Sequence, residues 1–324
     1  MKISLITPAP KQSRAGNRVT ARRWARLLRE LGHEVRVLRD YRDEPADLMI
    51  ALHAWRSAFS IERFRARHPA APLVVALTGT DIYRYAESDT ATTFRSLDLA
   101  DTLVGLHDLV RDALPREYRR KLTVIHQSAT ALPRRRPLRR LFEVLVIGHL
   151  REEKDPLRAA AAARLLPASS RIRIVHLGGA HDRQWAERAR REMGENPRYR
   201  WLGDVSGHAV RRALARAPLM VLSSIMEGGA NVVSEAVVAG VPVLASAIPG
   251  SIGLLGRDYP GYFPVGDAAA LARLMRRVEE DPAFRAALER HCAKRAPLFA
   301  PERERQAWRA LLARLVPARR AAEA

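Results

Sequence analysis

The sequence predicts an α/β protein with two Rossmann-like domains, each containing a parallel β-sheet. Short apolar runs alternate with segments of helical periodicity along most of the chain, and this alternation is typical of βαβ units. The chain has 324 residues, which is more than one average domain contains. The alternation stops once, near residues 133–137, and then starts again. Two domains of ordinary size are therefore expected.

The first half of the chain begins with a predicted strand at 2–7 and a predicted helix at 19–31. Trp24 and Leu28 lie on one apolar stripe of this helix. Gly32 follows at the position where a helix often ends in a left-handed residue. Further apolar runs predict the remaining strands of the first sheet, at 35–38, 48–52, 73–77, 102–106 and 122–125.

The second half repeats the same alternation, starting with an apolar run at 142–147. Asp155 and Pro156 are typical of the N-cap and first position of a helix, so an Ala-rich helix is expected from there to residue 166. The same patterns predict strands at 172–177, 199–202, 219–222 and 241–244, with helices at 183–193, 208–215 and 232–239. Helical patterns then follow at 268–295 and 301–315.

We therefore predict an N-terminal domain at 1–136, a C-terminal domain at 137–300, and a C-terminal helix and tail at 301–324 that packs back on the N-terminal domain. The prolines and arginines at 133–137 are predicted to form the hinge. Two parallel-sheet domains also imply a cleft between them, since ligand sites occur preferentially where domains meet. In such folds, ligands bind at the carboxyl ends of the strands.

The charge of the chain favours an anionic ligand without identifying it. The 56 basic and 35 acidic residues give a formal net charge of +21, which attracts nucleic acid, anionic lipid or phosphorylated metabolites. Aromatic residues make up only 6% of the chain and are scattered, whereas nucleic-acid binders interleave aromatics with basic surface. An arginine-rich nucleic-acid-binding protein is therefore the alternative and not the favoured class.

The sequence also predicts a cytoplasmic protein without a membrane span. Its single cysteine, Cys292, excludes an internal disulfide and a Cys-rich zinc site. The opening apolar run is too short for a secretory signal, and no later run reaches the roughly 18 apolar residues of a membrane span.

The most informative segment of the second half runs from Glu227 to Glu235, after a predicted buried strand. Small residues before a helix start allow a ligand to approach the backbone, and the free amides there favour a diphosphate. Glu227 and Glu235 can accept hydrogen bonds from sugar and ribose hydroxyls. The alternative is a surface helix with incidental acids. The small and polar residues of this predicted donor site are Gly228, Gly229, Ala230 and Asn231.

This spacing resembles the E-x7-E motif of GT4-like glycosyltransferases of the GT-B fold, and the loop that begins at Gly148 resembles the G-R-x5-K diphosphate loop of that family. The resemblance implies that Glu227 holds the donor sugar, Glu235 holds the ribose and Lys154 neutralises the leaving diphosphate of a UDP-sugar. His149 stands where the family usually has arginine, and Arg151 is the candidate to replace it. The alternative for Arg151 and Lys154 is a pair of solvated charges.

In the first half, a glycine-containing loop and a helix start again suit an anion. The residues are Arg14, Gly16, Asn17 and Arg18. A second loop follows the strand at 73–77 and resembles the H-G-x-D turn of the superfamily, with threonine in place of histidine. Its residues are Thr78, Gly79, Thr80 and Asp81, and the alternative for the aspartate is a purely turn-forming role.

His53 and His107 each stand at the carboxyl end of a predicted first-domain strand, where one of them could bind the acceptor. His126 has the same kind of position, and a satisfied structural histidine is the alternative for each. The histidines are too far apart along the chain to form a recognisable metal motif. We therefore predict no metal and no cofactor beyond the UDP-sugar substrate.

Taken together, the segments at 1–7, 16–20, 51–60, 77–81 and 227–235 make nearly the whole chain resemble the selenosugar synthases of selenoneine biosynthesis. That family joins selenium from selenophosphate to the anomeric carbon of a UDP-sugar and releases UDP. The resemblance implies transfer of a hexosyl or N-acetylhexosaminyl group to a small anion. A GT4-like enzyme with a carbohydrate or lipid acceptor and a GT-B sugar-nucleotide epimerase are the competing interpretations.

Overall fold

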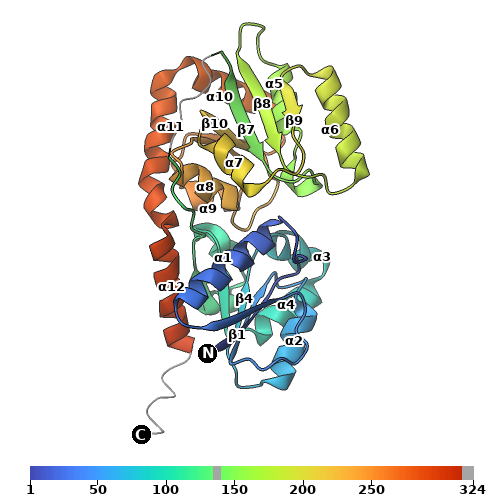
Figure 1. The fold of residues 1–324 in the computed structure, drawn as a ribbon, viewed down its shortest axis with the longest axis vertical. Helices are drawn as coiled ribbons and strands as arrows, with labels where there is room; N and C mark the ends of the chain where they lie inside the picture. The colour runs from blue at the N-terminus through green and yellow to red at the C-terminus, as the bar shows by residue number, and fades with distance from the viewer. Residues whose placement is uncertain (134–139, 316–324) are drawn as a thin grey trace. The chain divides into compact units, whose positions relative to one another are not determined.

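The computed structural model of the protein describes residues 1–133 and 140–315 (Figure 1). The chain forms two compact units. The first contains Met1–Ser128, Glu227–Asn231 and the described part of Phe299–Ala324, and the second contains Ala129–Met226 and Val232–Leu298. Residues 134–137 of the predicted hinge, and with them the predicted domain boundary, lie outside the described residues.

The first unit contains a parallel sheet of six strands in the order β2-β1-β3-β4-β5-β6. The strands are β1 (Lys2–Ile6), β2 (Glu34–Leu38), β3 (Leu48–Leu52), β4 (Leu73–Ala76), β5 (Thr102–Gly105) and β6 (Leu122–Val124). The helices are α1 (Gly16–Glu30), α2 (Ala58–Arg67), α3 (Ala86–Ser88), α4 (Thr90–Leu99) and α12 (Pro301–Leu315). A π-helix at Asp81–Tyr85 and 3-10 segments at Asp108–Ala113, Arg116–Lys121 and Ala296–Phe299 complete the short elements near them.

Both faces of the first sheet are buried, as the continuous apolar strands require. Ile50 of β3 belongs to a core with Trp24 of α1 and Trp308 of α12. The next residue along the strand, Ala51, points to the opposite core with Phe64 of α2. Trp24 and Trp308 meet edge to face with ring centroids 4.7 Å apart, so α12 is anchored to α1 by a large buried contact.

The second unit contains a parallel sheet of six strands in the order β12-β11-β10-β7-β8-β9. The strands are β7 (Phe142–Ile147), β8 (Ile172–Leu177), β9 (Tyr199–Trp201), β10 (Leu219–Leu222), β11 (Val243–Ser246) and β12 (Tyr262–Phe263). The helices are α5 (Arg158–Arg164), α6 (Arg183–Glu195), α7 (Gly207–Leu214), α8 (Asn231–Val238), α9 (Pro249–Leu255), α10 (Ala268–Glu280) and α11 (Pro282–Arg295). The predicted pair of parallel-sheet domains is therefore confirmed.

Several predicted boundaries are wrong for identifiable reasons. Asp155 has a left-handed backbone with φ +40° and ends a 3-10 turn, so α5 begins only at Arg158. The carboxylate of Asp155 instead pairs with Arg158 at 2.7 Å. The helical pattern predicted at 268–295 is two helices, because Asp281 caps a new helix through the Phe284 amide at 2.9 Å and Pro282 starts it.

Candidate functional site

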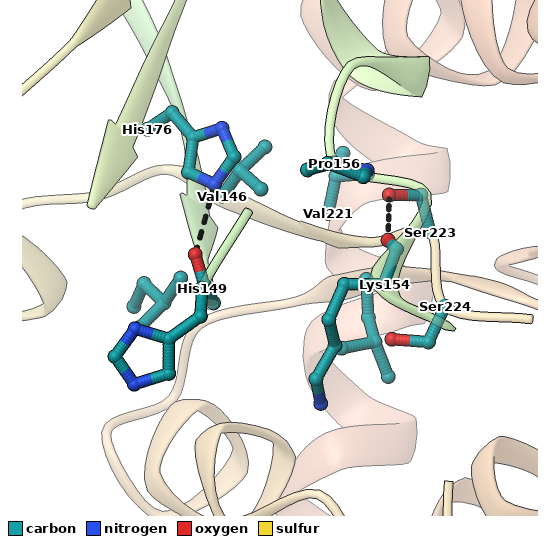
Figure 2. A pocket seen from close by; sticks show the side chains of 11 residues that line it. Val146, His149, Lys154, Pro156, His176, Val221, Ser223 and Ser224 are labelled. Atoms are coloured by element: carbon teal, nitrogen blue, oxygen red, sulfur yellow. Dashed lines mark hydrogen bonds between the residues drawn. The ribbon is translucent and has the colours of Figure 1, made fainter. Parts of the chain in front are cut away.

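The carboxyl edge of the second sheet carries a hollow with polar groups at its rim (Figure 2). β7, β8 and β10 are neighbours in this sheet, and the last residues of β7 and β10 form the apolar wall, together with Pro156. The polar lining comes from Gly148, His149, Lys154, His176, Ser223 and Ser224. Ligands of open α/β sheets bind at this edge, so the hollow is a candidate for part of a small-molecule site.

A buried histidine fixes the backbone of the loop that begins at Gly148. His176 Nε2 lies 3.0 Å from the carbonyl oxygen of Gly148, and His176 Nδ1 lies 3.0 Å from the hydroxyl of Tyr199. Burial lowers the pKa of His176 to about 4, so the ring is neutral at pH 7. Because the carbonyl can only accept, Nε2 carries the proton and Nδ1 accepts from the tyrosine.

The backbone of Lys154 is held by a residue that follows β10, the strand next to β7 in the sheet. Ser223 Oγ, just after β10, donates to the carbonyl oxygens of Lys154 at 3.2 Å and Asp155 at 2.9 Å (Figure 2). The Ile225 amide donates to the carbonyl of Glu153 at 2.9 Å. The Lys154 side chain therefore projects into the hollow from an ordered loop.

Arg151 has a different environment from Lys154. Its Nε lies 3.8 Å from the carboxylate of Glu153, and it is absent from the described residues that line the hollow. His149, which stands where the related motif has arginine, does line it. The geometry therefore favours Lys154 and His149 as the groups that face a ligand.

The glycines between the two glutamates make close contacts with other backbone segments of the first unit. A Cβ on Gly228 would lie 2.2 Å from the Gly79 amide nitrogen, and a Cβ on Gly229 would lie 2.4 Å from Cβ of Leu106. Gly229 also has φ +148°. Glycine is therefore required here for packing of the loop itself, which is a second reason beside the predicted approach of a ligand.

Glu227 and Glu235 occupy different settings. Glu227 is half-buried in the loop Glu227–Asn231, which belongs to the first unit, whereas Glu235 is half-buried one turn into α8 in the second unit. Between them, Ala230 is buried and Asn231 is the first residue of α8. The roles predicted for the two carboxylates stay predictions.

Asp81 forms the turn after β4. It is fully buried, and its carboxylate accepts hydrogen bonds from the backbone amides of Thr78, Gly79, Ile82 and Ala54 at 2.7–3.2 Å. These contacts give Asp81 a turn-forming role, and its predicted place in the acceptor cleft stays a prediction. The hydroxyl Oγ1 of Thr78 is buried without a hydrogen-bond partner among the described residues.

The two predicted histidines of the first unit are both buried. His53 adopts φ +76°, an unusual conformation for a non-glycine residue, and its Nε2 lies 2.8 Å from the hydroxyl of Thr80. His107 Nε2 lies 3.0 Å from the hydroxyl of Tyr83, and burial lowers the pKa of His107 to about 4. His107 Nδ1 is buried without a hydrogen-bond partner among the described residues, and the strained His53 borders the loop that carries Thr80. The acceptor-binding role predicted for the two histidines stays a prediction.

Arg18 is a buried cation in the first turn of α1. It is only 8% exposed, and its Nε has no hydrogen-bond partner among the described residues. Burial and the neighbouring charge of Arg22 both lower its pKa. The nearby Gly16 and Arg14 are exposed and Asn17 is half-buried. A buried guanidinium without a bonded carboxylate is suited to an anionic ligand.

The sequence predictions missed four polar residues of these two sheet edges: Thr7, His176, Ser223 and Ser224. Thr7 follows β1 and is fully buried, with its hydroxyl lacking a partner among the described residues. Each of the four stands within or just after an apolar run. A polar residue at the carboxyl end of a predicted strand is the signal that would have found them.

Residues 1–133 and 140–315 contain no group of three or more His, Cys, Asp or Glu residues suited to a metal ion. This part of the chain also contains no helix with the length and apolar character needed to cross a membrane. The predicted lack of a metal cofactor stays a prediction.

Residues 135–297, half of the chain, match the family described as glycosyl transferases group 1. The chain belongs to this family. The matched segment includes the Gly148 loop, Lys154, Glu227 and Glu235, so it covers the predicted donor-binding motifs. The expectation of a glycosyltransferase is thus confirmed at the level of the family.

A curated relative and several solved structures are similar to the chain. The 2-deoxystreptamine glucosyltransferase of Streptomyces kanamyceticus is 29% identical over 141 residues, which cover 42% of this chain and 36% of that protein. The chain thus aligns with about a third of the length of this relative. Anabaena HepE in complex with UDP has a TM-score of 0.77 at 16% identity, with 97% of this chain and 100% of that chain covered. Sucrose-phosphate synthase from Thermosynechococcus elongatus has a TM-score of 0.79 at 19% identity, with 98% and 99% covered. These structures confirm the predicted GT-B fold.

Proposed function

We propose that this protein transfers a sugar from a UDP-sugar donor and releases UDP. The observation that carries the proposal is the hollow at the carboxyl edge of the second sheet, into which Lys154 and His149 project. A cation held by an ordered loop at this edge suits the diphosphate of a nucleotide sugar. Membership of the glycosyl transferases group 1 family supports this interpretation, as does the HepE structure with UDP.

In the proposed reaction, the bond between the anomeric carbon and the diphosphate oxygen breaks, and the oxygen keeps the electron pair. A nucleophilic atom of the acceptor forms the new bond to the same carbon. Negative charge therefore develops on the leaving diphosphate, where the ammonium of Lys154 stabilises it more than it stabilises the bound substrate. Glu227 would hold the donor sugar and Glu235 the ribose, as their spacing implies.

The finer part of the proposal is that the acceptor is a small anion bound by the first unit, with selenophosphate as the specific candidate. The buried guanidinium of Arg18, whose Nε has no hydrogen-bond partner among the described residues, supports an anion, and the hydroxyls of Thr7 and Thr78 offer further donors. Selenium in this compound is already nucleophilic, so positioning and stabilisation of the leaving group would supply the catalysis.

The test is to incubate the protein with UDP-N-acetylglucosamine or UDP-glucose and follow UDP release, with mass analysis of the products. Separate reactions contain selenophosphate, phosphate, simple sugar alcohols or lipid acceptors. Release of UDP that depends on selenophosphate and yields a selenium-containing sugar would support both parts of the proposal. Release of UDP only with a carbohydrate or lipid acceptor would contradict the selenium assignment. No release from any UDP-sugar with any acceptor would contradict sugar transfer itself.

A further inference from the structure

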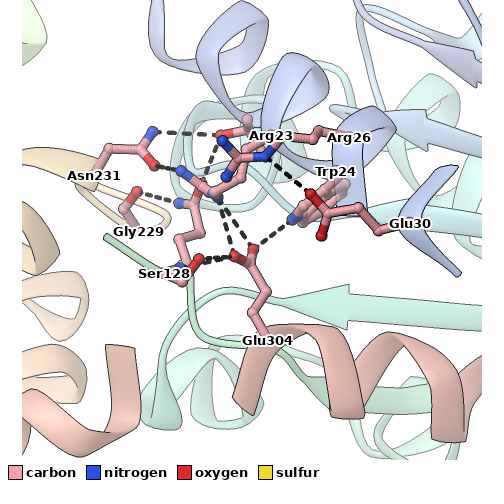
Figure 3. A network of polar contacts seen from close by, with 10 residues as sticks. Arg23, Trp24, Arg26, Glu30, Ser128, Gly229, Asn231 and Glu304 are labelled. Carbon is pink, nitrogen blue, oxygen red and sulfur yellow. Dashed lines mark hydrogen bonds and ion pairs between the residues drawn. The ribbon is translucent and has the colours of Figure 1, made fainter. Parts of the chain in front are cut away.

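We propose that Glu304, on the C-terminal helix α12, is a positioning residue for the loop Glu227–Asn231. Glu304, the loop and the residues that connect them belong to the first unit (Figure 3). The inference rests on the proposed function, in which Glu227 in this loop holds the donor sugar. Glu304 lies 73 positions after Asn231 in the sequence and touches no residue of the loop directly in any recorded contact, so it would act through Arg23 and Gln127.

The Glu304 carboxylate is completely buried and its recorded partners are all donors. Its side chain has 0% exposure. Oε1 accepts from Trp24 Nε1 at 2.7 Å and from Arg23 Nε at 3.2 Å. Oε2 accepts from the Ser128 amide at 2.9 Å and from the Ser128 hydroxyl. A buried carboxylate filled in this way fixes the orientation of its partners, because breaking one contact leaves a charged group unsatisfied.

Arg23 connects Glu304 to the loop Glu227–Asn231 through hydrogen bonds. Its Nη1 donates to Asn231 Oδ1 at 2.8 Å, and its Nη2 donates to Gln127 Oε1 at 2.5 Å. The Thr20 hydroxyl also donates to Gln127 Oε1 at 2.5 Å. The oxygen of the Gln127 amide is therefore engaged by two donors, and its Nε2 is directed to the carbonyl of Gly229 at 2.7 Å.

The loop consequently has polar attachments at the Gly229 carbonyl and at the Asn231 side chain, and Arg23 supports both through Gln127 and Asn231. Thr20 supports the same two groups, since its hydroxyl donates to Gln127 Oε1 and accepts from Asn231 Nδ2 at 3.3 Å. Glu227 lies two residues before the first attachment. Loss of the Glu304 charge would leave Arg23 without its buried counter-ion and would loosen both attachments. The expected consequence is a misplaced Glu227, whereas the Lys154 hollow, which lies in the second unit, keeps its own contacts.

Glu304→Gln is the most direct variant. It keeps the size of the side chain but places an NH2 group against donors that cannot accept, either the Ser128 amide or Trp24 Nε1. We expect kcat for UDP release to fall about 10- to 100-fold, the scale of a modest misplacement of a reacting group. The Kd for UDP in calorimetry should change less than about twofold, since Lys154 and Glu235, the residues proposed to hold UDP, belong to the second unit.

Trp308→Phe is the matched control, because Trp308 lies on the same helix and packs on Trp24 without a recorded hydrogen bond to the loop. It should lower the melting temperature and leave kcat unchanged. Asn231→Ala removes one attachment without changing α12 and should lower kcat as well. The double variant Glu304→Gln/Asn231→Ala should lose less than the product of the two single losses, because both act through Arg23.

An unchanged kcat in Glu304→Gln would overturn the inference. So would an equal loss of kcat in Trp308→Phe at equal loss of melting temperature, since that result describes general loosening of α12. If Glu304→Gln does not fold, Gln127→Met removes the connection to Gly229 together with the contacts of Gln127 to Arg23 and Thr20, and it should also lower kcat. A failure of the proposed function is distinguishable, because amide exchange at 227–231 can be measured without turnover. Faster exchange there in Glu304→Gln than in Trp308→Phe supports the positioning role, and equal exchange refutes it.

Discussion

Both units contain a parallel sheet of six strands, but the polar groups at the carboxyl edges of the two sheets differ in burial. In the second unit, Lys154 and His149 project into an open hollow, and the buried His176 supports their loop from behind. In the first unit, Arg18 and His53 are themselves buried. We propose that the second edge binds the diphosphate of the donor and that the first edge, with its buried cation, binds a small anionic acceptor.

The largest expected effect concerns the second edge. Lys154→Ala should lower kcat for UDP release about 100- to 1,000-fold, the loss seen when one donor to a developing anion is removed. KM should rise much less, because the charge on the diphosphate grows in the transition state. Steady-state kinetics with a UDP-sugar check this prediction. Arg276→Ala is the control, since Arg276 forms only an exposed pair with Glu280 on α10.

A normal kcat with only a raised KM in Lys154→Ala would show that Lys154 binds substrate and transition state equally. Arg151→Ala tests whether the loss of kcat is specific to Lys154. Because Arg151 pairs with Glu153 and does not line the hollow, its loss should lower kcat less than the loss of Lys154.

The next effect separates the two glutamates. Glu235→Ala should weaken UDP binding about tenfold or more, because charge-assisted hydrogen bonds to the ribose contribute roughly 1.5–3 kcal/mol. Glu227→Ala should leave the affinity for free UDP unchanged and lower kcat, since its proposed partner is the sugar. Calorimetry with UDP measures the first property and turnover the second. Equal losses of UDP affinity in the two variants would contradict this division.

The first edge predicts a trade-off at Arg18. Arg18→Met removes a buried charge that has no bonded carboxylate and keeps an apolar stem of similar length. The unliganded protein should therefore gain about 1 kcal/mol of stability, which corresponds to about 2–4 °C in melting temperature. Acceptor affinity should fall while UDP affinity stays the same. A variant that is destabilised and binds the acceptor normally would show that Arg18 has only a structural role.

The smallest effect near neutral pH comes from the buried histidines. The pKa of His176 and of His107 is lowered by burial to about 4 in the folded protein, against about 6.5 in the unfolded chain. Above pH 7 both states are neutral and neither histidine matters. As pH falls from 6.5 toward 4, the unfolded chain takes up a proton that the folded protein does not, so stability is lost. Each histidine should cost about 1 kcal/mol at pH 5.5.

Thermal unfolding from pH 7.5 to 5 checks this prediction. His176→Gln should flatten the dependence of the melting temperature on pH, whatever its effect on the melting temperature at pH 7.5. His208→Gln, a change at an exposed histidine, should leave the slope as it is. An unchanged slope in His176→Gln would refute the lowered pKa.

Periodicity predicted the architecture well, because apolar strands buried on both faces leave a clear pattern in the sequence. Ile50 and Ala51, for example, face opposite cores, and both belong to one apolar run. Local boundaries were less predictable. Asp155 and Pro156 have ideal residue types for a helix start, but tertiary contacts of the loop, including the Ser223 hydrogen bond to the Asp155 carbonyl, hold Asp155 in a left-handed turn.

The candidate site could be predicted where residue type and spacing act locally and not where distant segments meet. The glycines of the loop Glu227–Asn231 were predicted from their position between a strand and a helix, and Lys154 from its resemblance to a diphosphate loop. Glu304 could not be found in this way, because its meaning depends on Arg23 and Ser128, which are far from it in the sequence. Arg18 was only one of many arginines until its burial distinguished it.

The proposed sugar transfer requires that the folded chain bind UDP, the leaving group. Thermal unfolding in the presence of UDP, other nucleoside diphosphates and a short DNA tests it most directly, because a ligand that binds only the folded state raises the melting temperature. We expect a saturable rise of the melting temperature with UDP that is lost in Lys154→Ala and reduced in Glu235→Ala. A rise with DNA that disappears in high salt, with no response to UDP, would contradict it.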